Sequence, residues 1–157
     1  MLHRLILVVH ENALPQGQGW SPMTWQVLKD ASSIPITLFE AVSDLDAGPI
    51  HLQQQIALQG HELVEVARAL QAQATLELCL VWFDRNQNEV TAAQPQHGEA
   101  IRYRRRHPAD THLDPERPLA EQFNLLRVVD NQRYPAFVHW RAWRIVLQVQ
   151  PEPLRSS

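Results

Sequence analysis

The stretch LILVVHENALPQGQGWSPMTW, residues 5–25, decides the fold. Its first part, LILVV at residues 5–9, is a continuous apolar run, which is typical of a strand buried on both faces of a parallel α/β sheet. The polar segment 11–22, which contains Gly and Pro, predicts a loop. Pro22 directly after Ser21 predicts the start of a helix, with Ser21 as its N-cap. This order of strand, loop and helix predicts the α/β class.

Apolar patterns typical of strands and helices continue along the chain up to residue 83. Helical spacing of apolar residues by three and four predicts the longest helix, and alternating or continuous apolar runs predict strands. The polar, Pro-containing region after Phe83 predicts surface loops with one short strand. The expected elements are strands at 34–41, 48–58 and 100–103, helices at 61–82 and 119–130, and a hairpin at 134–149.

Composition limits the class of protein. The chain has 157 residues, 45% of them hydrophobic and 20% charged, which fits one globular domain and excludes a disordered chain. No apolar run approaches the roughly 18 residues that a membrane helix needs. The net charge of -3 gives no overall attraction to nucleic acid. A single cysteine, Cys79, excludes an intrachain disulfide and favours a reducing, cytoplasmic location.

His10 and Asp46 each follow a predicted strand at its carboxyl end. Ligands of open α/β sheets bind at such ends. If the two strands are neighbours, the imidazole and the carboxylate form an acid/base pair that suits acyl transfer. The alternative is that His10 is merely one of 8 histidines and Asp46 an ordinary turn residue before Gly48. The spacing alone leaves both interpretations open.

Two longer stretches carry a family resemblance: HENALPQGQGWSPMTWQVL at residues 10–28, and IPITLFEAVSDLDAGPIHLQQQIAL at residues 34–58. Together with YRRRHPADTHLDPERPLAEQFNLLRVVDNQRYPAF at 103–137, they resemble the catalytic unit of the folate-dependent formyltransferases. That family includes methionyl-tRNA formyltransferase and the sugar-nucleotide N-formyltransferases. The resemblance implies a partial Rossmann-like formyltransferase domain, with a mostly parallel sheet and flanking helices, followed by a short C-terminal helix and a β-hairpin.

The resemblance also implies a reaction and a site. The family's formyl donor is 10-formyltetrahydrofolate, and its acceptor is a primary amine. His10 would stabilise the developing oxyanion or carry the proton, and Asp46 would hold His10. The loop after the second predicted strand would wrap the pterin ring, so that Ala41, Val42, Asp44 and Asp46 become the cofactor-binding residues. No metal site is expected.

Three further residues are substrate-binding candidates. Trp20, in the Gly-containing loop, would line the acceptor pocket. Arg104 opens the run RRR at residues 104–106, which would bind substrate phosphate through bidentate contacts, although such runs are more often simply solvated. Arg127 matches the family's helix arginine and would either anchor a loop or contact an acceptor phosphate.

Two departures from the family are visible. Val8 stands where the family has a catalytic Asn two residues before the histidine. In addition, the strand that ends at this histidine lies mid-sheet in the family, so the resemblance implies that the N-terminal part of the catalytic domain is absent here. Residues 1–83 are then expected to form the C-terminal half of the core, and residues 84–157 a polar connection, helix and hairpin packed on the same domain.

The favoured interpretation is formyl transfer to the amine of a nucleotide-linked amino sugar, with methionyl-tRNA as a less favoured acceptor because of the negative charge. The alternative class is a truncated, non-catalytic binding or interaction module. The apolar run 5–9 without its family neighbours would expose an unpaired sheet edge, which predicts a homo-oligomer through that edge.

Overall fold

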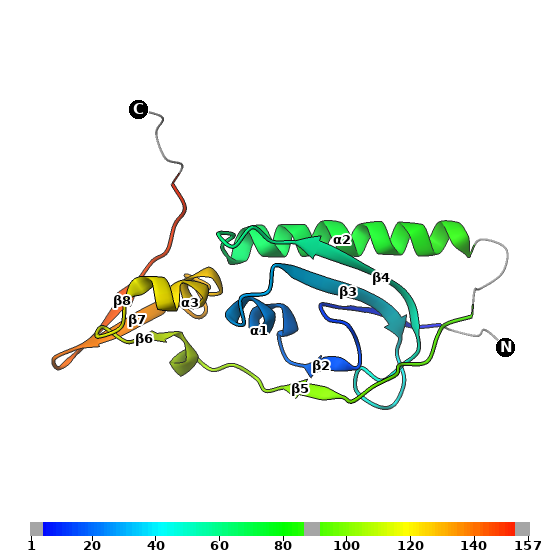
Figure 1. The fold of residues 1–157 in the computed structure, drawn as a ribbon, viewed down its shortest axis with the longest axis horizontal. Coiled ribbons are helices and arrows are strands. Elements are labelled where there is room, and N and C mark those ends of the chain that lie inside the picture. The colour runs from blue at the N-terminus through cyan, green and yellow to red at the C-terminus, as the bar shows by residue number, and fades with distance from the viewer. Residues whose placement is uncertain (1–4, 87–91, 153–157) are drawn as a thin grey trace.

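The computed structural model describes residues 5–86 and 92–152. Figure 1 shows a layered body with α2 along one side, and a smaller lobe built from α3 and the last strands. The elements are β1 (Leu7–His10), β2 (Gln16–Gly19), α1 (Pro22–Leu28), β3 (Ser33–Glu40), β4 (Ile50–Ala57), α2 (Val64–Arg85), β5 (Ile101–Tyr103), η1 (Pro108–Thr111), β6 (His112–Leu113), η2 (Leu119–Gln122), α3 (Phe123–Arg127), β7 (Ala136–Trp140) and β8 (Trp143–Leu147).

The main sheet has three strands in the order β1–β3–β4. Both of its pairs are antiparallel, with Leu7 opposite Glu40 and Ser33 opposite Ala57. The α/β class is therefore confirmed, but the expectation of a mostly parallel sheet is wrong for this part of the chain. Segment 41–49 is too short for the crossover of a dozen or more residues that parallel neighbours require, so β4 returns beside β3 in the opposite direction.

The predicted loop 11–22 contains a strand that the sequence did not reveal. β2, with the sequence QGQG, pairs in parallel with β5. No apolar alternation marks it. Gly17 and Gly19 have φ angles of 76° and 101°, a region that L side chains rarely adopt, which explains glycine at both positions. Ser21 does occupy the N-cap position of α1, but its side chain makes no capping hydrogen bond.

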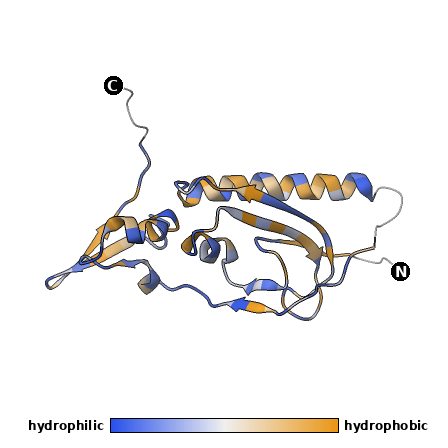
Figure 2. Ribbon diagram, in the orientation of Figure 1, coloured by the Kyte–Doolittle hydropathy of each residue, from blue (hydrophilic) through white to orange (hydrophobic). Residues whose placement is uncertain are grey.

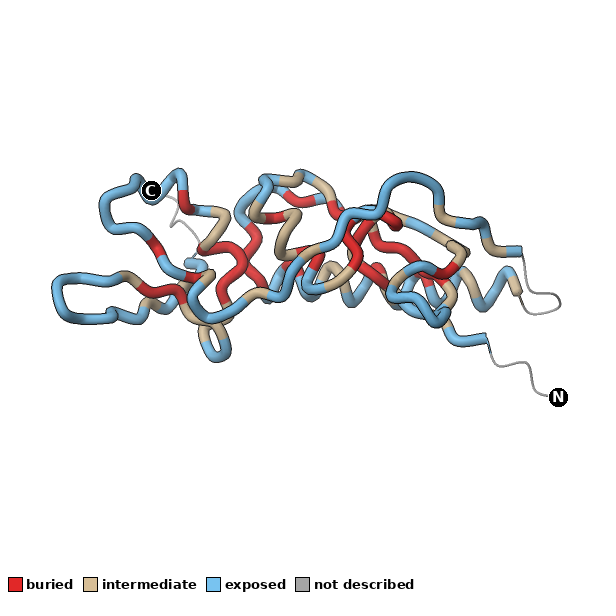
Figure 3. The backbone as a smooth tube through the Cα atoms, turned by 90° about the horizontal axis from the view of Figure 1, so that it is seen from below, coloured by how far each residue is buried: buried red, intermediate tan, exposed pale blue. Residues whose placement is uncertain are grey.

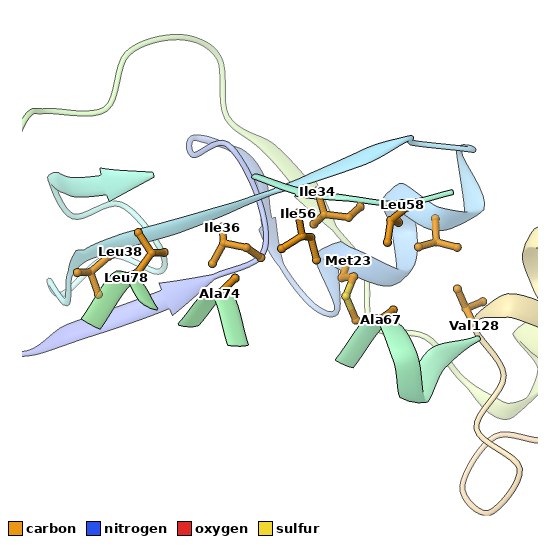
Figure 4. Close-up of a cluster of buried hydrophobic side chains, with 11 residues drawn as sticks. Met23, Ile34, Ile36, Leu38, Ile56, Leu58, Ala67, Ala74, Leu78 and Val128 are labelled. Atoms are coloured by element: carbon orange, nitrogen blue, oxygen red, sulfur yellow. The ribbon is translucent and has the colours of Figure 1, made fainter. Parts of the chain in front are cut away.

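The core lies between α2 and the main sheet. Ile34, Ile36 and Leu38 of β3 are almost fully buried against α2, which contributes Ala67, Ala74 and Leu78 (Figure 4). These positions repeat every second residue in the strand and are seven and four residues apart in the helix, as burial of one face requires. Orange bands run along α2 in Figure 2. The side of α2 that faces away from the core exposes several large apolar residues: Val66, Leu76, Leu80 and Phe83.

A second apolar cluster, of Leu113, Leu126, Val129 and Ala136, holds the C-terminal lobe together. Figure 3 shows buried segments in both parts of the molecule. The expected helix 119–130 is divided into a 3-10 turn, η2, and the short α3. The expected hairpin is present as β7 and β8. Among the described residues, no helix is long and apolar enough to cross a membrane. The division of the chain at residue 83 stays a prediction.

Side-chain contacts join this lobe to the rest of the molecule. α3 packs beside α1, where the Asn124 amide donates to the Asp30 carboxylate at 3.2 Å. Arg68 of α2 forms an ion pair with Asp130 at 3.1 Å. The lobe is therefore held against both helices of the larger body.

Candidate functional site

His10 and Asp46 meet as the sequence predicts. The imidazole Nε2 lies 3.8 Å from Asp46 Oδ2 and 3.1 Å from the carbonyl oxygen of Gly17. His10 is buried, with 8% of its surface exposed. The expected reason for the contact is wrong, however. Because β1 and β3 are antiparallel, their carboxyl ends lie at opposite ends of the two-stranded ladder. Asp46 reaches His10 because segment 41–46 turns back along the sheet.

The turn that places Asp46 is held from three sides. Asp46 adopts a left-handed conformation with φ 52°, and its Oδ2 accepts the backbone N–H of Gly19 at 3.0 Å. Its carbonyl oxygen accepts the amides of Gln96 at 2.8 Å and Gln18 at 3.3 Å. The Gln96 amide also donates to the carbonyl oxygen of Gly48 at 2.7 Å. Sequence reasoning missed Gln96, since nothing in the polar segment around it marks a contact with this turn.

A cavity of about 270 Å³ opens beside this pair. Val8, Phe39 and the whole segment 41–46 line it. The structure thus brings together all the residues predicted to bind the cofactor: Ala41, Val42, Asp44 and Asp46. Val8 forms part of the wall at the position where the family has Asn, so this wall presents a methyl surface instead of an amide. The cofactor-binding and catalytic roles of these residues stay predictions.

Glu11 and Asn12, the two residues that follow His10 in the chain, add a charged and a polar group next to it. Burial raises the pKa of Glu11, while the nearby His10 lowers it and the nearby Asp46 raises it, so the three groups are electrostatically linked. Its carboxylate accepts the amide of Gln71 from α2. Asn12 is also buried, and its amide nitrogen has no hydrogen-bond partner among the described residues.

Two of the three substrate-binding candidates, Trp20 and Arg104, directly follow the paired residues Gly19 and Tyr103, whereas Arg127 belongs to α3. Trp20 is more than half exposed, and the Arg105 guanidinium lies 4.9 Å above its ring. Arg104 is engaged by both oxygens of Asp110, at 2.6 and 2.7 Å. This bidentate contact holds the pKa of the Asp110 carboxyl well below its usual range.

For Arg127, the structure favours one of the two roles that the resemblance suggests. Arg127 is 1% exposed, and its guanidinium donates to the Glu62 carboxylate at 3.2 Å and to the Glu62 carbonyl oxygen at 3.3 Å. A phosphate of a bound acceptor could not reach it without breaking this pair. Of the two roles that the resemblance suggests for Arg127, anchoring a loop therefore fits the structure and contact with substrate does not.

The chain was compared with protein families and with solved structures. No protein-family model matches the chain. Methionyl-tRNA formyltransferase from Clostridium thermocellum is similar in structure, with TM-score 0.72 and 23% identity over 90% of this chain and 61% of that chain. A 4-N formyltransferase from Francisella tularensis has TM-score 0.79 and 16% identity over 96% of this chain and 64% of that chain.

A third structure holds ligands. The formyltransferase PseJ from Anoxybacillus kamchatkensis, in complex with UDP-4,6-dideoxy-4-formamido-L-AltNAc and tetrahydrofolate, has TM-score 0.55 and 20% identity over 62% of this chain and 51% of that chain. This chain thus spans between 51% and 64% of the length of these three proteins. The likeness in shape agrees with the motifs at residues 10–28 and 34–58. The described part of the chain therefore has the fold of a part of the formyltransferases, the family that its motifs resemble.

Proposed function

We propose that this chain carries the catalytic pair and the folate-binding turn of an N-formyltransferase, which moves a formyl group from 10-formyltetrahydrofolate to a primary amine. One observation carries the proposal. The cavity lined by Val8, Phe39 and segment 41–46 ends at Asp46, whose carboxylate faces His10. A cofactor pocket and an acid/base pair thus share a residue, as formyl transfer from a bound donor requires.

The cavity suits the flat, polar ring of a reduced folate. Phe39, Val8 and Leu45 offer apolar surface, and the backbone of segment 41–46 offers hydrogen-bonding groups along one wall. Flat heterocycles are held in proteins by this combination of apolar walls and a few polar groups. Tetrahydrofolate bound to PseJ supports the same class of donor. When bound, 10-formyltetrahydrofolate supplies the formyl carbon that the amine attacks.

His10 and Asp46 divide the proton chemistry between them. As the new C–N bond forms, the amine must lose a proton, and the folate nitrogen must gain one as the old C–N bond breaks. The His10 imidazole accepts and returns that proton, and the Asp46 carboxylate stabilises the imidazolium in between. Asp46 is oriented for this by the N–H of Gly19. Because Val8 donates no hydrogen bond, we expect a rate about hundredfold below that of a site with a full set of oxyanion donors.

The acceptor that we favour is an amino sugar linked to a nucleotide. PseJ, with its bound UDP-formamido sugar, supports this class. Methionyl-tRNA is the second candidate, supported by the Clostridium enzyme, but the net charge of -3 gives no attraction to a polyanion. We place the reaction in the cytoplasm, because the lone Cys79 is exposed and forms no disulfide. Residues 1–83 would form the half-core, with 84–157 packed on it.

A non-catalytic binding module is the competing function, and Val8 favours it. A single set of measurements separates the two. Tetrahydrofolate should raise the melting temperature of the chain, because a ligand that binds only the folded state stabilises it, by about 2.7 kcal/mol at one hundred times its Kd. Asp46→Asn should keep this shift but abolish formyl transfer from 10-formyltetrahydrofolate to an amino-sugar nucleotide.

Asp30→Asn is the matched control, since Asp30 is exposed, accepts a hydrogen bond from the Asn124 amide, and does not line the cavity beside Asp46. It should change neither property. If millimolar tetrahydrofolate produces no shift in the unmodified chain, the formyltransferase assignment fails and the binding module stands. If Asp46→Asn loses binding and turnover equally, Asp46 is a pocket residue and not part of an acid/base pair.

The free edge of β1 supports an oligomer. Within residues 5–86 and 92–152, β1 pairs with β3 on one side only, and Leu5 and Ile6 before it are 40% and 61% exposed. An apolar edge with unpaired backbone groups is a template for another strand. We propose that two copies pair through β1. Sedimentation across a concentration series should show a dimer that Ile6→Lys dissociates, and a monomer at high concentration would contradict this pairing.

A further inference from the structure

A second cavity, of about 210 Å³, lies between α1, α2 and the segment after β5. Its wall includes Trp20, Arg68, Arg105, Arg106, Asp130 and Tyr134. None of these residues lines the cavity beside Asp46. The cavity thus combines aromatic rings with guanidinium groups from two separate parts of the chain, an arrangement that the overall charge does not suggest.

The charges around this cavity do not balance. Three arginines line it against the single carboxylate of Asp130, which is already paired with Arg68 at 3.1 Å. Arg105 forms no ion pair with a described residue and instead lies over the Trp20 ring. The cavity therefore carries excess positive charge, in a chain whose net charge is -3.

Arg106 adds a buried donor. One of its terminal nitrogens donates to the carbonyl oxygen of Asp110 at 2.9 Å, but its Nε is buried and has no partner within the described residues. Burial lowers the pKa of Arg106, an effect that the nearby Asp110 carboxylate partly offsets. An anion in the cavity would stabilise this cation and could accept its unused hydrogen bond.

The cavity is close to the proposed catalytic pair along the chain. Trp20 directly follows Gly19, whose N–H binds the Asp46 carboxylate at 3.0 Å. Consecutive Cα atoms lie about 3.8 Å apart, so the Trp20 backbone is one peptide unit away from the residue that holds Asp46. Arg104, the predicted phosphate contact, does not line this cavity and is held by Asp110.

We propose that this cavity binds the phosphate groups of the acceptor, with Arg105 and Arg106 as the cationic ligands and the Trp20 ring covering the adjoining sugar or base. The inference rests on the proposed function and assigns the residues that would hold the phosphate or diphosphate of the acceptor. Planar guanidinium groups match phosphate oxygens in pairs, which a lysine does not. The residues that read the substrate are then the second and third arginines of the run 104–106, and neither Arg104 nor Arg127.

Titration calorimetry of the whole chain with inorganic pyrophosphate and with uridine diphosphate, at constant ionic strength, tests this. Arg105→Gln should weaken the binding of both probes about tenfold or more, the usual effect of losing a hydrogen bond to a charged group. Arg105 is exposed and forms no ion pair with a described residue, so the variant should fold. Arg117→Gln, which removes the same charge from an exposed pair with Glu121, should change nothing.

Trp20→Ala separates nucleotide from free phosphate. It should weaken uridine diphosphate more than pyrophosphate, because only the nucleotide can pack on the ring. The inference is overturned if neither probe binds at millimolar concentration, or if Arg105→Gln binds both as tightly as the unmodified chain. Tetrahydrofolate titrated into the same samples distinguishes the two proposals. Folate binding without pyrophosphate binding overturns this inference alone, and the reverse result supports the cavity while overturning the formyltransferase assignment.

Discussion

Removal of the Arg127 guanidinium should destabilise the protein strongly, because it is the partner of a buried carboxylate. Arg127→Met fills similar space but removes the cation, while the backbone N–H groups of Gln59 and Gly60 still donate to the Glu62 carboxylate at 2.6 and 3.0 Å. Breaking a buried ion pair from one side costs about 3–5 kcal/mol. The two remaining donors place our expectation near the lower end, about 3 kcal/mol. That is a large share of a typical domain stability of about 5–15 kcal/mol.

Urea unfolding followed by circular dichroism measures this loss as a lower midpoint at unchanged slope. Arg117→Met is the control, since its pair with Glu121 is exposed and such pairs contribute about 0.2–1 kcal/mol. The double variant Arg127→Met, Glu62→Gln should recover part of the loss, because the uncompensated charge is gone. A loss below about 1 kcal/mol at neutral pH, with the fold intact, would refute the anchoring role.

The stability that depends on the Glu62 carboxylate also changes with pH. Burial raises the pKa of Glu62, but hydrogen bonds from the backbone N–H groups of Gln59 and Gly60 outweigh it and hold the pKa below its ordinary value. A lowered folded-state pKa contributes stability that is present at neutral pH and is lost as the pH falls through the folded-state value. The difference between Arg127→Met and the unmodified chain should therefore be measured near pH 7, where the carboxylate is charged.

Three further changes test other contacts. Because burial is the main cause of the raised pKa of Glu11, the folded state loses stability as pH rises above about 4.3, so Glu11→Gln should be at least as stable at pH 7 and lose that advantage at lower pH in thermal unfolding. A Cβ on Gly48 would meet the Glu40 carbonyl oxygen at 1.7 Å, so Gly48→Ala should cost about 1–3 kcal/mol or more in urea unfolding and weaken tetrahydrofolate binding by displacing segment 41–46. Val8→Asn should raise the rate of formyl transfer even if it weakens folate binding, because Val8 lines the folate cavity, so the rate is measured at saturating donor; an unchanged rate would mean that another donor already serves.

The sequence predicted the elements whose burial requires a visible pattern. β1, β3 and α2 were found because each shows an apolar run or helical spacing. The core confirms the reason for β3 and α2. The expectation that the run 5–9 is buried on both faces is wrong, because Leu5, Ile6 and Val8 are exposed at the edge of the sheet. β2 was missed because its role is to bring glycine backbone close to Tyr103 and Asp46, which needs no apolar side chain. The direction of β4 depends on the length of its connection to β3, which the apolar pattern does not encode.

The candidate site was also predicted only in part. His10 and Asp46 could be paired through their motifs, although the path of the chain between them could not. The burial of Arg127 could not be foreseen, since arginine is mostly a surface residue and its partner Glu62 lies 65 positions away. The cavity of Trp20 and Arg105 combines residues 85 positions apart, and only the pairing of β2 with β5 places them together.

The two hydrogen bonds of Gln96 have a consequence for anyone who redesigns this chain. The stretch 92–100 before β5 looks like a place to shorten the protein or to graft a tag, because it is polar and mostly exposed. Yet Gln94 pairs through its backbone with Ile50, and Gln96 holds the turn at Asp46 and Gly48. A minimal version that joined α2 directly to β5 would keep every helix and every strand of the main sheet while releasing the turn that faces His10. A deletion should therefore leave residues 94–96 in place. An insertion within them would disturb the turn that positions Asp46.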